Sequence, residues 1–247
     1  MKKFREFLVT LYFYFIATVY IVFYGGFVLL RSFLMRDKEE ARRYVLKEIK
    51  KFGRRAFGWL FSKVIVEGEE NIPKDRNFIV VANHQSLMDI PLILGFVATG
   101  AFIAKEELRK IPGVNWYIKY LNGVFLDRKN PRKAVKALRE AIEKLRNGVT
   151  FIVFPEGTRS PNGEMLPFKK DSLMIAMRTG VLVLPVSIWG TYHLIPKNHW
   201  VFTPGKVFLR IHKPVNPREF SKEEELRKYV EGVIKKGVEE LKERWSE

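Results

Sequence analysis

No charged residue occurs between Phe7 and Leu30, and this apolar run is the strongest constraint on what the chain can fold into. About 20 apolar residues in a helix are enough to cross the hydrocarbon core of a bilayer. The run is too long for the core of a secretory signal peptide, and it lacks an Ala-x-Ala-like cleavage site. The sequence therefore predicts a permanent membrane-associated helix rather than a buried core helix or a removed leader.

Basic residues flank the run on both sides, which favours keeping both of its ends on the cytoplasmic face of a cell membrane. The tyrosines along the run and Gly25-Gly26 near its end favour a monotopic helix that lies obliquely in one leaflet. A single-pass helix is the alternative. In either arrangement the more basic C-terminal flank places the main domain in the cytoplasm. The flanking residues are Lys2, Lys3 and Arg5 before the run and Arg31, Arg36, Lys38, Arg42 and Arg43 after it.

The next segment, from Lys38 to about Lys63, has the pattern of a basic amphipathic helix, with apolar residues at steps of three and four. Such a helix is typical of an interface with anionic lipid, although a solvated helix packed on the protein has the same pattern. With the apolar run it would form a two-helix hairpin. We expect residues 1–63 to dock the protein on a membrane and residues 64–247 to form an α/β domain. The apolar positions are Ala41, Val45, Ile49, Phe52, Ala56 and Leu60.

The charge balance predicts a polyanionic partner. The chain has 44 Lys and Arg residues against 27 Asp and Glu residues, a formal net charge of +17. Nucleic acid and an anionic phospholipid membrane would both attract this charge. The apolar run favours the membrane, and no aromatic motif for base stacking is evident, so no nucleic acid partner is expected. Cysteine is absent, which excludes disulfides, a thiolate nucleophile and cysteine-ligated zinc.

From about residue 64, strand and helix signals alternate along the chain. This alternation predicts an α/β fold with a mostly parallel, twisted sheet flanked by helices. One or two antiparallel strands are expected near the end. The predicted strands are Val64–Glu67, Phe78–Ala82, Ala101–Ala104, Val124–Asp127, Thr150–Phe154, Leu182–Ser187 and Lys206–Ile211, and the predicted helices are Leu87–Val97, Glu106–Tyr120, Pro131–Arg146, Lys170–Thr179 and Glu223–Arg244.

His84 follows the predicted strand Phe78–Ala82, and Asp89 lies five residues further along. In open α/β sheets, ligands bind beyond the carboxyl ends of the strands. A carboxylate one turn into the next helix can reach back to the imidazole, fix its tautomer and leave the other ring nitrogen to act as a general base. We therefore predict that His84 and Asp89 are a catalytic pair. A structural histidine that caps a helix and bonds a nearby acid would have the same spacing.

The segment Phe-Pro-Glu-Gly-Thr-Arg-Ser at 154–160 follows another predicted strand and should open at the same edge of the sheet. Gly157 would let the backbone approach a ligand closely. Arg159 offers a planar fork for phosphate oxygens and Thr158 offers a hydroxyl. Glu156 is expected to bond a substrate hydroxyl or to hold the arginine. The alternative is a plain surface turn whose arginine pairs with a nearby acid.

Two further basic residues follow predicted strands at this edge. Arg128 comes after Val124–Asp127, and Lys105 comes after Ala101–Ala104. Two or three cations around a dianionic phosphate are chemically reasonable, because each charge-assisted hydrogen bond contributes roughly 1.5–3 kcal/mol. The alternatives are a surface ion pair between Asp127 and Arg128 and a solvated lysine.

Four segments, in this order along the chain, resemble the four motifs of the glycerolipid acyltransferase family, most closely its 1-acylglycerol-3-phosphate acyltransferase branch. The resemblance extends from about Phe78 to Val186, nearly half of the chain, and the first and third motifs match in full. The segments are His84-x4-Asp89, Gly123-Val124-Phe125-Leu126-Asp127-Arg128, Phe154-Pro155-Glu156-Gly157-Thr158-Arg159-Ser160 and Val183-Leu184-Pro185-Val186.

The resemblance implies that a fatty acyl group moves from acyl carrier protein or a CoA thioester to the sn-2 hydroxyl of lysophosphatidic acid, forming phosphatidic acid. It implies direct attack by the acceptor, without an acyl-enzyme and without a cofactor. It assigns the second and third motifs to the acceptor phosphate and the fourth to the acyl or donor path. The fourth segment also fits a core strand with a proline at a bulge. Ser86 is not expected to be a nucleophile, because no Gly-x-Ser-x-Gly elbow surrounds it.

Other readings of the same motifs remain open. The acceptor could be glycerol 3-phosphate or another lysophospholipid, and a non-catalytic basic membrane-binding protein is the alternative of a different class. No metal site is predicted, because the three other histidines lack a carboxylate at ligand spacing. No glycine-rich nucleotide-binding loop is present.

Overall fold

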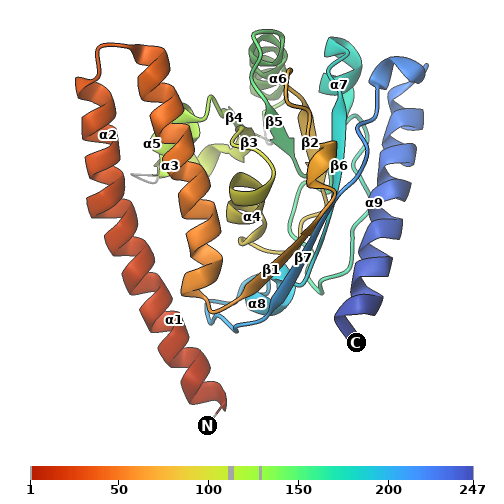
Figure 1. Cartoon of the computed structure of the whole chain (residues 1–247). Coiled ribbons are helices and arrows are strands. Elements are labelled where there is room, and N and C mark those ends of the chain that lie inside the picture. Colours follow the sequence, from red (N-terminus) through yellow and green to blue (C-terminus); the bar gives the residue numbers. More distant parts are fainter. Residues whose placement is uncertain (1, 111–113, 128–129, 247) are drawn as a thin grey trace.

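The computed structural model describes residues 2–110, 114–127 and 130–246. Helices and strands alternate along most of the chain, as predicted (Figure 1). The elements are α1 (Lys2–Val19), a π-helical turn η1 (Tyr20–Tyr24), α2 (Gly25–Leu34), α3 (Lys38–Trp59), β1 (Lys63–Glu67), a 3₁₀ turn η2 (Glu69–Asn71), β2 (Ile79–Ala82), α4 (Asp89–Phe96), β3 (Ala101–Lys105), a 3₁₀ helix η3 (Glu106–Lys110), α5 (Val114–Tyr120), β4 (Val124–Leu126), α6 (Pro131–Arg146), β5 (Phe151–Val153), α7 (Met174–Thr179), β6 (Val183–Trp189), α8 (Thr191–Leu194), β7 (Lys206–Ile211), a 3₁₀ turn η4 (Pro217–Glu219) and α9 (Glu223–Ser246).

In the described part of the chain, seven strands form one sheet in the order β1-β7-β6-β2-β5-β3-β4. Neighbouring strands run parallel except for β6 and β7. The predicted α/β fold, with a mostly parallel sheet and an antiparallel strand near its end, is therefore confirmed. The order places β2 beside β5, with Val81 opposite Val153. The two strands that lead into the best-matching motifs are thus neighbours.

Helices cover both faces of the sheet, because alternate residues of each strand point to opposite sides. On one face, Val80 and Ala82 of β2 belong to a core that includes residues of α3 and α4. On the other face, Ile79 and Val81 pack in a core with residues of α6, α7 and α9. Figure 1 shows α9 and the N-terminal helices on opposite sides of the sheet. Burial on both faces explains why the central strands are continuous apolar runs.

The N-terminal segments form the expected helical hairpin. α1, η1 and α2 follow one another without a break, and α3 returns beside them (Figure 1). Asp37 begins α3, because its side chain accepts hydrogen bonds from the backbone N–H groups of Glu39 (2.8 Å) and Glu40 (3.1 Å). One helix in the described residues is long and apolar enough to cross a membrane: Lys3–Leu34, with a mean hydropathy of 2.0.

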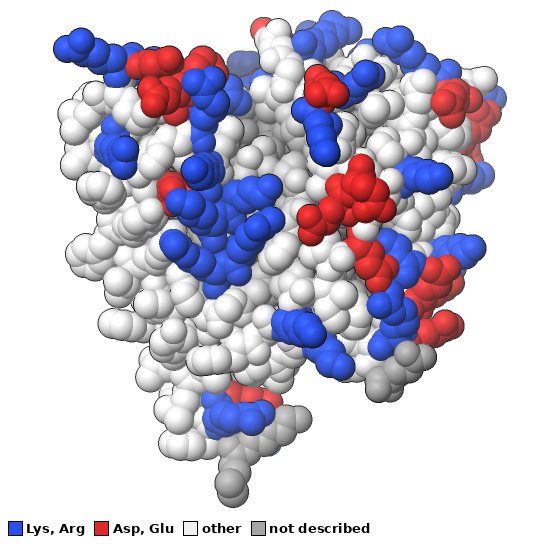
Figure 2. All heavy atoms as spheres, in the orientation of Figure 1, with Lys and Arg blue, Asp and Glu red and all other residues white. Residues whose placement is uncertain are grey.

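α3 is attached to the α/β domain through α4. Gly53 and Gly95 meet where the two helices cross, and a Cβ atom at Gly53 would lie only 2.6 Å from the backbone nitrogen of Gly95. The apolar side of α3, including Val45 and Phe57, is buried. Its apolar stripe therefore packs within the protein, and its basic side chains remain outside. Figure 2 shows Lys and Arg side chains gathered over this helix.

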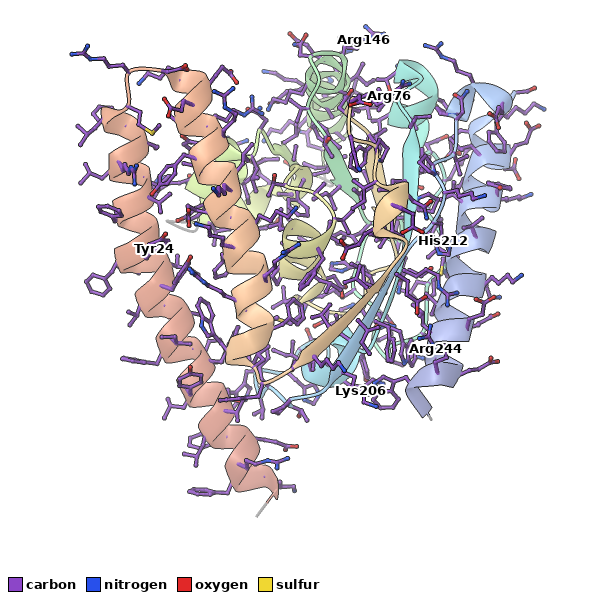
Figure 3. All side chains as sticks on the ribbon, in the orientation of Figure 1. Tyr24, Arg76, Arg146, Lys206, His212 and Arg244 are labelled. Atoms are coloured by element: carbon purple, nitrogen blue, oxygen red, sulfur yellow. The ribbon has the colours of Figure 1, made fainter. Side chains whose placement is uncertain are left out.

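A buried polar contact joins α9 to the sheet. Ser187 of β6 donates a hydrogen bond to the carbonyl of Ile234 in α9 (2.9 Å), and its Oγ lies 2.8 Å from His212 Nε2. His212 follows β7 and lies beside α9 (Figure 3). Burial is the main reason that the pKa of His212 falls to about 4, and the nearby Arg210 lowers it further. The fold therefore requires an uncharged imidazole here at neutral pH.

Two local expectations need correction, and one short helix was not expected. The single helix predicted over Glu106–Tyr120 is instead the 3₁₀ helix η3 and the separate α5, with residues 111–113 outside the described part. α7 begins at Met174 rather than Lys170, because Asp171 has a positive φ of 61° that interrupts any helix before it. The short α8 had no sequence signal, since its four residues give no periodicity.

Candidate active site

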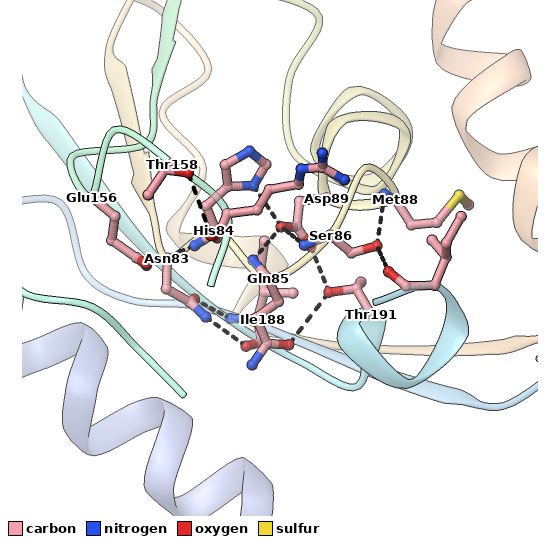
Figure 4. A network of polar contacts seen from close by, with 12 residues as sticks. Asn83, His84, Gln85, Ser86, Met88, Asp89, Glu156, Thr158, Ile188 and Thr191 are labelled. Atoms are coloured by element: carbon pink, nitrogen blue, oxygen red, sulfur yellow. Dashed lines mark hydrogen bonds and ion pairs between the residues drawn. The ribbon is translucent and has the colours of Figure 1, made fainter. Parts of the chain in front are cut away.

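The structure brings His84 and Asp89 together at the carboxyl end of β2. His84 Nδ1 lies 2.8 Å from Asp89 Oδ2 (Figure 4). Between β2 and His84, the Asn83 side chain donates to the carbonyl of Ile188 (2.9 Å) and accepts from its N–H (2.8 Å). These two hydrogen bonds extend the pairing of β2 with β6 by one residue. It fixes the point from which His84 turns out of the sheet.

Asp89 is fully buried and surrounded by hydrogen-bond donors. Oδ2 accepts from the backbone N–H groups of Gln85 (2.7 Å) and Ser86 (2.8 Å), and Oδ1 accepts from the Thr191 hydroxyl (2.5 Å) (Figure 4). Because Asp89 offers only acceptor oxygens to the imidazole, the ring proton is assigned to Nδ1. Nε2 then carries the lone pair that a general base needs.

The segment after β5 holds His84 from a second side. The imidazole stacks on the Phe154 ring, with 4.0 Å between ring centroids and 17° between ring planes. The backbone N–H of His84 donates to Glu156 Oε1 at 2.8 Å. The third motif thus contacts both the side chain and the main chain of the candidate base.

Glu156 has a different position from the one that we expected. Its carboxyl group is buried, and its second oxygen accepts from the backbone N–H of Leu166 (3.2 Å). Burial raises the pKa of Glu156 to about 8, although the hydrogen bonds from His84 N–H and Leu166 N–H act in the opposite direction. Glu156 does not line the cavity described below. We expected this carboxyl group to contact a substrate hydroxyl or Arg159. It instead holds the backbone N–H groups of His84 and Leu166.

His84 lines a cavity of about 980 Å³. The end of β3 and the loops after β5 and α8 give it cationic walls, and the hairpin, α4 and α5 give it apolar walls. This combination suits an amphiphile with an anionic head and a long apolar chain. Among the described residues, no group of three or more His, Cys, Asp or Glu could hold a metal ion. Lining residues from the apolar side include Val28, Ile49, Phe52, Leu94, Phe102 and Leu121.

Most of the predicted phosphate-binding residues reach this cavity. Lys105, Gly157, Thr158 and Arg159 all line it together with His84. Arg128, the remaining predicted residue, lies outside the described residues.

Sequence reasoning missed three cavity lysines, Lys169, Lys170 and Lys197. They lie in loops between elements, where neither periodicity nor a motif marked them. The only available signal was their positive charge, which 44 Lys and Arg residues share in this chain.

Two other segments singled out from the sequence lie away from the cavity. Ser86 is fully buried and donates to the carbonyl of Ile195 (2.9 Å), which agrees with its exclusion as a nucleophile. The fourth motif is a buried part of β6. Val183 pairs with Val215, and Val186 pairs with Ile211. The three residues 212–214 therefore lie opposite the two residues 184 and 185. The motif is therefore a core strand whose proline lies opposite a bulge in the facing segment 212–214, and it does not line the cavity.

Comparison with known proteins identifies the family. The Acyltransferase family model matches residues 63–189, a region that includes His84, Asp89 and the 154–160 segment. The chain belongs to the acyltransferase family. This confirms the family that the motifs predicted.

Relatives of this acyltransferase include proteins from bacteria and plants. The 1-acyl-sn-glycerophosphate (LPA) acyltransferase PlsC from Thermotoga maritima, which has a crystal structure, is 81% identical in sequence to this chain. The two structures match with a TM-score of 0.95, and the match covers 100% of both chains. The 1-acyl-sn-glycerol-3-phosphate acyltransferase of Borreliella burgdorferi is 36% identical over 190 residues, which are 74% of this chain and 75% of the relative. The chloroplastic enzyme LPAT1 of Arabidopsis thaliana is 37% identical over 158 residues, 63% of this chain and 44% of LPAT1. The match thus spans less than half of the length of this plant relative.

Proposed function

We propose that the chain is a 1-acyl-sn-glycerol-3-phosphate O-acyltransferase, which moves a fatty acyl group from a thioester to the sn-2 hydroxyl of lysophosphatidic acid. The observation that carries the proposal is the His84 imidazole, bonded to Asp89 through Nδ1, in a cavity that Arg159 and apolar helices also line. The reaction needs a base, a cation for the acceptor phosphate and room for an acyl chain in one place. The names of the bacterial relatives support the same reaction.

The chemistry follows from the orientation of the imidazole. Nε2 of His84 takes the proton of the acceptor hydroxyl as the oxygen attacks the thioester carbonyl carbon. The new C–O bond forms, the tetrahedral intermediate collapses, the C–S bond breaks, and the imidazolium returns the proton to the leaving thiolate. Asp89 stabilises the imidazolium between these steps. The acceptor attacks directly, so no acyl-enzyme forms.

The acceptor phosphate binds to Arg159 and Lys105, with the Thr158 hydroxyl as a further donor, and Arg128 remains a proposed member of this group. Arg159 suits this task because a guanidinium can donate two parallel hydrogen bonds to phosphate oxygens. The apolar cavity walls hold an acyl chain. The donor is a thioester of acyl carrier protein or CoA, and no cofactor is needed. The net charge of +17 would attract either donor, because both carry phosphate groups.

The hairpin docks the enzyme on an anionic phospholipid membrane as a monotopic helix pair on the cytoplasmic face. The apolar helix is hydrogen-bonded to the rest of the protein at several points along its length, and this attachment disfavours a helix that stands alone across a bilayer. Residues 1–63 thus serve docking, and residues 64–247 serve catalysis. The bonds run from Phe202 N to Thr10 Oγ1 (2.8 Å), from Tyr14 Oη to Trp200 O (3.2 Å) and from Tyr24 Oη to Glu48 Oε2 (2.8 Å).

The proposal is tested with purified protein and thioesters of acyl carrier protein and CoA. The acceptors are lysophosphatidic acid, glycerol 3-phosphate and a lysophospholipid with a phosphodiester head, and the products are resolved by chromatography. Phosphatidic acid is the expected product. His84→Ala should lower its rate about 10²–10⁴-fold while vesicle binding persists. Equal rates in wild type and His84→Ala would refute the assignment of His84 as the base. If glycerol 3-phosphate is the one acceptor that is acylated, it takes the place of lysophosphatidic acid in the proposed reaction.

A further inference from the structure

Lys169 lies against Gly157 and Lys197 contacts Thr158, both in the cationic wall of the cavity. They come from two loops that are distant in sequence, one after the third motif and one after α8. Both line the same cavity as His84 and Arg159.

Lys197 is fixed by the third motif itself. Its ammonium group donates a hydrogen bond to Thr158 Oγ1 at 3.1 Å, and its side chain is half-buried. A lysine ammonium has three N–H donors. Two therefore remain for a ligand. The Thr158 hydroxyl accepts from Lys197 and donates only a long bond of 3.5 Å to the carbonyl of Arg159, which a phosphate oxygen could replace.

Lys169 is held against the turn at Gly157. Its backbone N–H donates to the carbonyl of Pro155 at 3.0 Å. Its side chain passes so close to Gly157 that a Cβ atom there would lie 3.1 Å from Nζ. Gly157 also has a positive φ of 70°. The glycine of the motif thus makes room for the lysine stem, which explains its residue type here without a ligand.

Neither ammonium group has a carboxylate partner within ion-pair distance among the described residues. Other lysines of this chain do have one: Lys51 pairs with Glu48 and Lys144 pairs with Glu140, both at 2.6 Å. Uncompensated cations that converge on one turn indicate that an anion belongs between them. The charge of this wall exceeds what a single negative charge requires, because Lys105 and Arg159 also line it.

We propose that Lys169 and Lys197, together with the Thr158 hydroxyl, bind the terminal oxygens of a phosphate monoester and so select monoester over phosphodiester acceptors. This inference rests on the proposed function and names the acceptor class of that same site. A phosphate monoester has three free oxygens and a charge of about −1.5 to −2 at pH 7. A phosphodiester has two free oxygens and a single charge. The two lysines supply the extra charge and donors that only the monoester can use.

The test compares Lys169→Met, Lys197→Met and Lys197→Arg with wild type. Lys136→Met is the matched control, because it removes one exposed positive charge on α6, outside the cavity. Acyl transfer is measured in uncharged detergent micelles with lysophosphatidic acid and with lysophosphatidylglycerol. Each Met variant should raise the KM for lysophosphatidic acid about 10- to 100-fold, the effect of one charge-assisted hydrogen bond. The half-buried Lys197 should have the larger effect. The KM for lysophosphatidylglycerol should change less, and Lys197→Arg should recover part of the preference.

A binding measurement separates this inference from the proposed function. Calorimetric titration with glycerol 3-phosphate should give weaker binding to both Met variants than to wild type and Lys136→Met. If wild type fails to acylate lysophosphatidic acid, the proposed function fails, and this loss of binding still supports the subsite. Unchanged binding in both Met variants, or an equal loss of activity towards monoester and diester acceptors, would overturn the proposal that the two lysines bind the monoester.

Discussion

The Thr191 hydroxyl donates a 2.5 Å hydrogen bond to Asp89 Oδ1 across 102 residues of sequence. Both side chains are fully buried. Thr191 begins α8 directly after β6, whereas Asp89 begins α4 after β2. The two oxygens of Asp89 therefore have separate tasks: Oδ2 orients the imidazole, and Oδ1 is held by the first residue of α8.

Thr191→Val should lower kcat about tenfold with little change in the acceptor KM. The variant keeps the shape of the side chain but removes the donor to Oδ1, and a hydrogen bond to a charged group contributes about 1.5–3 kcal/mol. Thr191→Ser keeps the hydroxyl and should retain most of the activity. The measurement is kcat against pH, because a freer imidazole should also shift the profile. A Val variant with a wild-type kcat and profile would show that Oδ1 needs no anchor.

Glu156→Gln should reduce kcat more than it changes the acceptor KM, and it should reduce the free energy of unfolding by about 1–3 kcal/mol. The substitution replaces one of the two accepting oxygens with an NH₂ group, which then faces the N–H of His84 or of Leu166 as a second donor. Glu164→Gln is the control, because this exposed glutamate on the same loop pairs with the surface Lys242. Denaturant unfolding measures the change in the free energy of unfolding, and steady-state kinetics measures the changes in kcat and KM. A large rise in KM at constant kcat would instead favour direct contact with the acceptor.

Leu30→Ser should weaken binding to anionic vesicles by about tenfold or more. Burying a leucine side chain in an apolar environment is worth roughly 1.5–3 kcal/mol, and Leu30 on the hairpin is 59% exposed. Val135→Ser is the matched control, because this α6 side chain is 51% exposed outside the hairpin. Vesicle co-sedimentation measures both. Equal effects of the two substitutions would contradict docking through the hairpin.

Acid should destabilise the fold through His212. Because its folded-state pKa of about 4 lies below the ordinary value of 6.5, the neutral imidazole contributes stability above pH 6.5. This contribution is lost as the pH falls through 6.5 towards 4. His212→Gln should lack this part of the decline in Tm, whereas His199→Gln, at an exposed loop position, should keep it. Parallel Tm curves for wild type and His212→Gln over this range would contradict the assignment.

The parts of the site that sequence could predict are local. His84 and Asp89 are five residues apart, so a strand end followed by one turn is enough to bring them together. The central strands were recognisable because burial on both faces makes them continuous apolar runs. Arg159 and Lys105 reach the cavity because parallel strands end at the same edge of a sheet.

The parts that sequence could not predict depend on long-range partners. Glu156 was expected at a substrate, but Leu166 and His84 occupy its oxygens. Lys169 and Lys197 carried no pattern, since a loop lysine is polar wherever it lies. The amphipathic stripe of α3 could not reveal whether lipid or protein would cover it, because both are apolar surroundings.

The sequence by itself determined the α/β class, the base with its acid, and the apolar and basic character of the hairpin, because each is written in residues close together along the chain. The tertiary structure decided which strands lie side by side, which donors hold Asp89, and which cations surround Thr158. Those outcomes depend on the packing of surfaces from distant segments, whose meeting no local pattern specifies.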